Sequence, residues 1–191
     1  MTTKKQTIID IATELFNKEG YQAVGIDKII TEAGISKLTL YRNFVSKDQL
    51  IIEVLTQRKN DFIKNITEAI ENNHTPKDKI FSIFNYYHTW FKDEKFRGCM
   101  FTNSLLEFGY KSKEICNINK EMKQALVALI AEILFSQVKK EQAQRIAFTF
   151  VILLDGAIIS ELTYADHSEY SPALLAWATA KTILDAENIV L

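Results

Sequence analysis

Hydrophobic residues recur with the spacing of an α-helix along almost the whole chain. Between residues 8 and 33, aliphatic and aromatic residues return every three or four positions in two groups separated by Gly20. The pattern predicts a first helix that ends near Glu19 and a second, shorter helix from Ile26 to Ala33. Because no segment alternates polar and apolar residues with a period of two, the predicted fold class is all-α.

A tight turn is predicted between the second helix and a third. Gly34 follows the second helix directly, where a glycine easily adopts the left-handed conformation that ends a helix, and Ser36 is suited to be the next N-cap. Three short helices with such a turn form a helix-turn-helix, whose last helix fits a DNA major groove about 12 Å wide. Small helical bundles without DNA-binding activity share this spacing. The residues on the surface of the third helix must therefore distinguish a DNA-binding domain from such a bundle.

A capping box starts a long fourth helix. Residues 46–49 read Ser-Lys-Asp-Gln, the S-x-x-Q pattern, and Val45 and Leu50 are placed to form a hydrophobic staple. The helix is predicted over residues 47–71, and it is long enough to leave one domain and enter another. We therefore predict an N-terminal helix-turn-helix domain, residues 1–46, and a larger helical ligand-binding and dimerisation domain, residues 47–191. Further helices are predicted at about 77–92, 102–108, 113–137, 141–164 and 172–187.

The outward face of the third helix is rich in groups that read DNA. Leu40 and Phe44 are predicted to face the core. Arginine can pair with guanine, asparagine with adenine, and threonine or leucine can touch a thymine methyl group, while lysine and tyrosine reach phosphates. An ordinary solvated helix face is the alternative for any one of these residues alone. The outward set is Lys37, Leu38, Thr39, Tyr41, Arg42 and Asn43.

The ordered motifs of residues 8–55 resemble the TetR-type (tetracycline repressor) family of bacterial regulators. They are Ala12-x-x-Leu15-Phe16, Gly20-Tyr21, Ile26-x-x-Ile29, Ala33-Gly34-Ile35-Ser36-Lys37, Thr39-Leu40-Tyr41-Arg42-Asn43-Phe44 and Ser46-Lys47-x-x-Leu50. The resemblance implies a two-fold dimer, a divergent helical ligand domain, and release of DNA when an effector binds. Carried over by position, it implies operator contacts from Ser36, Lys37, Thr39, Tyr41 and Arg42, and a phosphate contact from Lys47.

The sequence departs from the family pattern at two positions. Gly25 stands where a serine or threonine usually caps the second helix, which removes a side-chain contact to phosphate. Leu38 stands where glycine is common. Its bulk either contacts bases directly or prevents close approach of the backbone, so an unusual operator sequence is expected.

An aromatic segment is the candidate effector site. Aromatic residues from position 84 to 91 precede a Gly-Cys-x-x-x-Asn-x-x-x-Glu segment that resembles one subset of TetR-type ligand domains. Such a mixture suits a pocket for an apolar or aromatic small molecule, although a simple core is the alternative. Asp155 could meet a ligand cation or a donor of a partner chain, or make a core hydrogen bond. Cys99 could be a reactive thiol or a core residue. The predicted ligand-binding residues are Phe84, Tyr87, His88, Phe91, Asn103, Glu107, Phe150 and Asp155.

The last two helices are the predicted dimer interface. Residues 146–159 are apolar on nearly every side, which predicts a helix that is buried all round. The last helix offers the small residues Ala173, Ala176 and Ala180 beside Trp177, and we expect this face to meet a second copy. A purely intramolecular core is the alternative.

Composition narrows the remaining choices. The net charge of −1 argues against wholesale electrostatic binding to nucleic acid, and the two cysteines form no CxxC pair. No uninterrupted apolar run reaches about 20 residues and the first residues lack a signal-peptide core, so a cytoplasmic protein outside the membrane is expected.

No nucleophile, base or metal cluster suggests an enzyme, and no cofactor or metal is expected. A repressor is predicted, with operator DNA, a small-molecule effector and a second copy as partners. A carrier of hydrophobic ligands and an activator are the alternatives.

Overall fold

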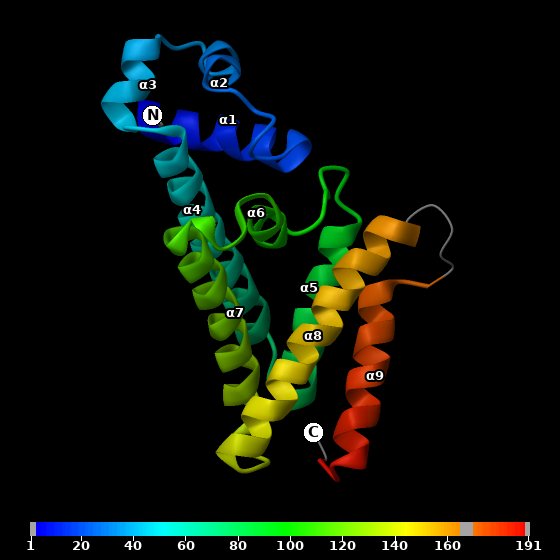
Figure 1. Cartoon of the computed structure of the whole chain (residues 1–191). Helices are drawn as coiled ribbons and strands as arrows, with labels where there is room; N and C mark the ends of the chain where they lie inside the picture. The colour runs from blue at the N-terminus through cyan, green and yellow to red at the C-terminus, as the bar shows by residue number, and fades with distance from the viewer. Residues whose placement is uncertain (1–2, 165–169, 190–191) are drawn as a thin grey trace. The chain divides into compact units, whose positions relative to one another are not determined.

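The computed structural model describes residues 3–164 and 170–189, and within these ranges the chain is built from helices without a strand (Figure 1). The all-α prediction is confirmed. The predicted helix ends lie within a few residues of those in the structure, and the fourth helix has the predicted bounds. The helices are α1 (Lys4–Glu19), α2 (Ile26–Glu32), α3 (Lys37–Asn43), α4 (Lys47–Glu71), α5 (Pro76–Phe91), α6 (Met100–Phe108), the short 3₁₀ turn η1 (Gly109–Lys111), α7 (Lys113–Leu134), α8 (Lys140–Tyr164) and α9 (Pro172–Ala186).

The turn between α2 and α3 has the predicted chemistry. Gly34 has a φ of +61°, in the left-handed region that favours glycine. The Ile35 N–H donates to the Ile30 carbonyl at 3.1 Å, which is the outer hydrogen bond of a Schellman motif. Ser36 then caps α3, because its hydroxyl accepts the Thr39 N–H at 3.1 Å. The helix-turn-helix geometry is thus fixed by signals within a few residues.

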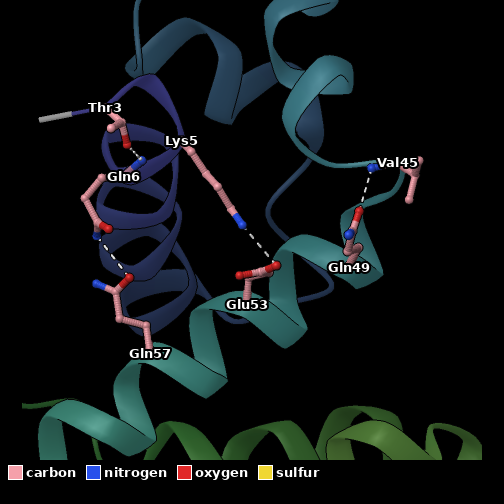
Figure 2. Close-up of polar contacts among 7 residues, drawn as sticks. All are labelled: Thr3, Lys5, Gln6, Val45, Gln49, Glu53 and Gln57. Carbon is pink, nitrogen blue, oxygen red and sulfur yellow. Dashed lines mark hydrogen bonds and ion pairs between the residues drawn. The ribbon is translucent and has the colours of Figure 1, made fainter.

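The start of α4 is capped in part as predicted. The Ser46 hydroxyl accepts the Gln49 N–H at 3.1 Å. The Gln49 side chain accepts the Val45 N–H at 2.7 Å (Figure 2). The prediction of a hydrophobic staple between Val45 and Leu50 is wrong, because Leu50 is fully buried whereas Val45 is 79% exposed. At Val45 the chain turns its N–H toward Gln49 and leaves the side chain in solvent.

Contacts divide the chain into two compact units. Unit 1 contains residues 1–60 and 99–120, and unit 2 contains residues 61–98 and 121–191. The long helices α4 and α7 each contribute residues to both units. Unit 1 thus includes α6, in addition to the helix-turn-helix. This division differs from the predicted boundary after residue 46, which rests on the DNA-binding motif and stays a prediction.

In unit 1, α1 is fastened to α4 by polar side chains as well as by the apolar core. Lys5 Nζ lies 3.1 Å from Glu53 Oε1, and the Gln6 amide donates to Gln57 at 3.0 Å (Figure 2). Beneath these contacts lies a core of fully buried side chains that α1, the α1–α2 turn, α2, α3 and α4 provide. Its members include Ile8, Ala12, Tyr21, Val24, Ile29, Leu40, Leu50, Ile51 and Val54.

In unit 2, α9 packs against both α5 and α8 and supplies small residues to the contact (Figure 1). Ala173 and Ala180 are fully buried there, Ala176 is 7% exposed, and Trp177 lies against the rings of Phe81 and Phe84. The prediction that this face of the last helix meets a second copy is therefore wrong. The small side chains allow α9 to pack closely against α5 and α8 of the same chain. The exposed face of α9 carries the larger residues Leu174 and Leu175.

Within the single chain, α8 is not buried all round, which corrects a second prediction. Phe148, Ile152 and Ile159 are 55–59% exposed, although Phe150 and Leu154 on the same helix are fully buried. Among the described residues, α8 is the one helix with the length and composition of a membrane span, and 39% of that apolar window is buried. Length and composition are weak evidence for a membrane, because core helices of soluble proteins share them.

Candidate nucleic-acid interface

The exposed face of α3 carries most of the residues predicted to contact DNA. Leu38 is 61% exposed and Tyr41 is 45% exposed, while Leu40 and Phe44 are buried, as predicted. Ser36, Lys37 and Arg42 are also exposed, and Thr39 is half-buried. In the helix-turn-helix, one side of α3 is thus packed in the core, and the opposite side presents both polar and apolar side chains to solvent.

Several polar groups of α3 already have partners inside unit 1. The hydroxyls of Ser36 and Thr39 lie 2.9 Å apart, and the Asn43 amide donates to the Thr39 carbonyl at 2.8 Å. Lys37 Nζ lies 3.4 Å from the Asp27 carboxylate, in an exposed pair that contributes little stability. For Arg42, no hydrogen bond or ion pair is present among the described residues. Its guanidinium is therefore available to an external acceptor.

Lys47, the predicted phosphate contact, lies in the first turn of α4 and is half-buried. Its ammonium group donates to the Gln22 carbonyl at 3.3 Å. Burial lowers the pKa of Lys47 from its ordinary value, and the nearby carboxylates of Glu107 and Asp48 act in the opposite direction. The lysine therefore links the α1–α2 turn to α4 in the absence of DNA.

Glu107, a predicted ligand-binding residue, holds the α1–α2 turn of unit 1. Its carboxylate accepts the backbone N–H groups of Tyr21 and Gln22 at 2.9 and 2.6 Å. The Gln22 amide returns a hydrogen bond to the Glu107 carbonyl at 2.6 Å. A side chain at Gly20 would come within 3.0 Å of Glu107 Oε1, so glycine leaves room for this contact. Both carboxylate oxygens of Glu107 are thus already engaged by the helix-turn-helix.

A second contact joins α6 to the same turn. Tyr21 is fully buried, and its phenol donates to the Met100 carbonyl at 2.9 Å. Burial raises the pKa of Tyr21 far above its ordinary value, and the thiol of Cys99 and the carboxylate of Glu107 add to the rise. The phenol therefore remains a donor at every physiological pH. Nothing in the local sequence around residue 21 signals these contacts, because their partners lie about 80 residues further along the chain.

The aromatic ligand-site candidates in unit 2 form two pairs of contacting rings. The rings of Phe84 and Phe150 lie 5.8 Å apart edge to face, and those of Tyr87 and Phe91 lie 6.2 Å apart. All four side chains are buried. His88 is half-buried, and its Nδ1 lies 2.7 Å from the Ser171 hydroxyl. Burial lowers the pKa of His88, and nearby Lys92 lowers it further.

The remaining ligand-site candidates have different surroundings. Asp155 forms an ion pair with Lys123 of α7, so a protein cation already neutralises it. Asn103 and Glu107 belong to unit 1. Cys99 is buried, which favours its interpretation as a core residue. A hollow of about 280 Å³ in unit 2 lies elsewhere, between the start of α5 and the end of α7, and is lined by Pro76, Lys79, Leu129, Glu132, Ile133 and Ser136.

The geometry of unit 1 is that of the helix-turn-helix class of proteins. Residues 8–54 match the family described as bacterial regulatory proteins, tetR family. The fatty acid metabolism regulator protein of Bacillus subtilis is 31% identical over 77 residues, or 40% of each chain. The transcriptional activator FasR of Mycolicibacterium smegmatis is 33% identical over 67 residues, or 35% of this chain and 31% of that one. The chain thus spans less than half the length of these curated relatives.

Solved structures extend the likeness to nearly the whole chain. SCO4454, a TetR-family transcriptional regulator from Streptomyces coelicolor, is 24% identical with a TM-score of 0.84, over 96% of this chain and 95% of that one. The regulator FadR from Bacillus subtilis, solved with stearoyl-CoA, is 20% identical with a TM-score of 0.66, over 92% and 95%. Residues 8–54 thus carry the sequence match to the tetR family, and the solved structures show that the rest of the chain shares their fold.

Proposed function

We propose that this protein is a transcriptional regulator that binds operator DNA through α3. The observation that carries the proposal is the exposed face of α3 inside the segment that matches the TetR family. Arg42 offers donors to base edges or phosphates, and Lys37 and Lys47 offer phosphate contacts from the start of α3 and α4. Ser36, Thr39, Tyr41 and Leu38 complete the proposed surface. The regulators that resemble this chain also make an enzyme a poor alternative.

The working form is proposed to be a homodimer in the cytoplasm, joined through α8 and α9. Phe148, Ile152 and Ile159 of α8 and Leu174 and Leu175 of α9 are exposed apolar side chains on neighbouring helices. A row of this kind on a soluble protein marks an interaction surface. A two-fold dimer presents two copies of α3, which must reach successive major grooves about 34–36 Å apart, so the operator is expected to be palindromic.

An apolar or aromatic small molecule is proposed to release the DNA by entering unit 2. Its core around Phe84, Tyr87, Phe91 and Phe150 is aromatic, and the rings would have to separate to admit a ligand. FadR, solved with stearoyl-CoA, has a similar fold and binds a molecule with a long apolar chain. Because α4 contributes to both units, a tilt of α4 would change the separation of the two α3 helices. Linkage then requires that DNA and effector weaken each other's binding equally, by about 5–150-fold.

The test is selection of binding sites from random duplex DNA with the purified full chain. The proposal expects an enriched palindrome that is bound by a dimer, with an affinity that falls as the salt concentration rises. A reporter gene behind the selected site distinguishes repression from the activation for which FasR is named. Failure to enrich any sequence, combined with binding of a fluorescent fatty acid, would favour the carrier of hydrophobic ligands instead.

A further inference from the structure

The exposed face of α3 contains apolar side chains where polar readers are expected. Leu38 and Tyr41 are three residues apart, so they share one side of the helix. Of the five large hydrophobic residues exposed in the described part of unit 1, these two lie in α3 and Val45 follows it directly. Isolated exposed leucines are ordinary on protein surfaces, but here the leucine stands in the centre of the proposed DNA-reading side.

The polar groups beside Leu38 are largely directed back into the protein. The hydroxyls of Ser36 and Thr39 lie close to each other, and the Asn43 amide is bonded to a carbonyl of its own helix. These groups give up hydrogen bonds if they turn toward base edges. Besides Lys37 at the start of the helix, Leu38, the Tyr41 ring and the Arg42 guanidinium are left as the outward chemistry of α3.

Base edges in the major groove offer one apolar group, the 5-methyl group of thymine. A leucine has no donor or acceptor, so it cannot replace the water that hydrates the polar edge of a guanine or cytosine. An unpaired polar group buried in this way weakens binding by about 5–150-fold, whereas a methyl group buried against leucine strengthens it. A leucine at this place therefore rejects G·C pairs and favours T·A pairs.

We propose that Leu38, with the ring of Tyr41 beside it, selects thymine in each operator half-site through the 5-methyl group. The inference rests on the proposed DNA binding and names the chemistry that α3 recognises. It makes Leu38 a residue that determines specificity, whereas Lys37 next to it anchors the helix to phosphate.

The experiment removes only the methyl group. In the palindrome selected by the full chain, each thymine is replaced in turn by deoxyuridine, symmetrically in both half-sites, and the dissociation constant is measured. At one thymine position the affinity should fall about fourfold per half-site, the effect of burying one methyl group. Replacing that pair by C·G should weaken binding further, and 5-methylcytosine should recover part of the loss.

Two variants assign the effect to Leu38. Leu38→Ala should bind the thymine and deoxyuridine duplexes equally, because the methyl group has lost its partner. Lys37→Ala, the control, should weaken both duplexes and keep their ratio. Thermal unfolding by circular dichroism checks that both variants fold, as expected for exposed positions. The inference is overturned if no deoxyuridine weakens binding, or if the penalty persists in Leu38→Ala. Absence of any selected palindrome would instead reject the proposed function itself.

Discussion

The two units place their apolar and polar side chains in different ways. Unit 1 uses polar contacts to hold its parts together: Glu107 binds the α1–α2 turn, Glu53 binds Lys5, and Ser36 caps α3. Unit 2 has an aromatic core, and α8 and α9 leave further apolar side chains in solvent. Hydrogen bonds fix positions and angles more narrowly than apolar contacts do, which suits the presentation of a reading helix.

The difference agrees with the distinct tasks that we propose for the two units. A DNA-reading helix must keep its geometry, since a small misplacement affects every contact in the groove at once. A ligand core has to open, and an oligomer interface has to be apolar before its partner covers it. The predictions below test this division of tasks, in order of decreasing expected effect.

The largest effect is expected at the exposed side of α8. Ile152→Glu places a charge in the proposed dimer interface while leaving the core of the single chain intact, since Ile152 is half-exposed there. The protein should become a monomer in light scattering. Operator affinity should fall by about 10²–10⁴-fold, because the second half-site is no longer held by the same molecule. Ala128→Glu on α7, also at an exposed position, is the control and should remain a dimer.

A comparison within one helix tests the inside of unit 2. Phe150 is fully buried, and Phe148 two residues earlier is 59% exposed. In the monomeric Ile152→Glu background, Phe150→Ala should lower the free energy of unfolding in urea by about 3–5 kcal/mol. Phe148→Ala in the same background should change it little. Equal losses for the two variants would contradict the assignment of the buried and exposed sides of α8.

The polar attachment of α6 to the helix-turn-helix should contribute less. Glu107→Ala leaves the N–H groups of Tyr21 and Gln22 without their acceptor, which should cost about 1–3 kcal/mol in unfolding free energy. Operator affinity should fall as well, because the α1–α2 turn is no longer held. Glu107→Gln retains one acceptor oxygen and should lose less. Glu132→Ala removes an exposed carboxylate from α7 and serves as the control, so a loss equal to that of Glu107→Ala would contradict the attachment.

The smallest effect concerns pH. The pKa of His88 is lowered from 6.5 in the folded protein, mainly by burial. As the pH falls below 6.5, the unfolded chain binds the proton more readily than the folded protein does, so stability decreases. The urea concentration at the unfolding midpoint should thus decrease when the pH is lowered from 7.5 to 5.5. His88→Gln should make this decrease smaller, and the glutamine can still bond Ser171. A fall of the same size in the variant would show that other groups cause it.

Local signals made unit 1 the easier unit to predict. Gly34, Ser36 and Ser46 act within a few residues of themselves, and the structure confirms the turn and the caps that they predict. The contact of Glu107 with Tyr21 escaped prediction because 86 residues separate the two, and no local pattern records such a pairing. The local pattern of residues 98–107 predicts a ligand contact for Glu107 instead.

The orientation of α9 escaped prediction for a different reason. Apolar residues occupy nearly all sides of this helix, so periodicity does not tell which side packs inside its own chain. The small residues Ala173, Ala176 and Ala180 suit close packing of any two helices, and they are used within the chain. The larger Leu174 and Leu175 are the ones left in solvent.

The central claim, that α3 reads DNA, is tested most directly by a Tyr41→Ala, Arg42→Ala double variant. Both side chains are exposed, so the variant should unfold at the same temperature as the parent chain. Its affinity for the selected palindrome should fall by about 5–150-fold, the 1–3 kcal/mol expected for loss of a base-reading arginine. Lys120→Ala, which also removes one exposed positive charge, should bind as the parent does. Unchanged operator affinity in the folded double variant would contradict the account.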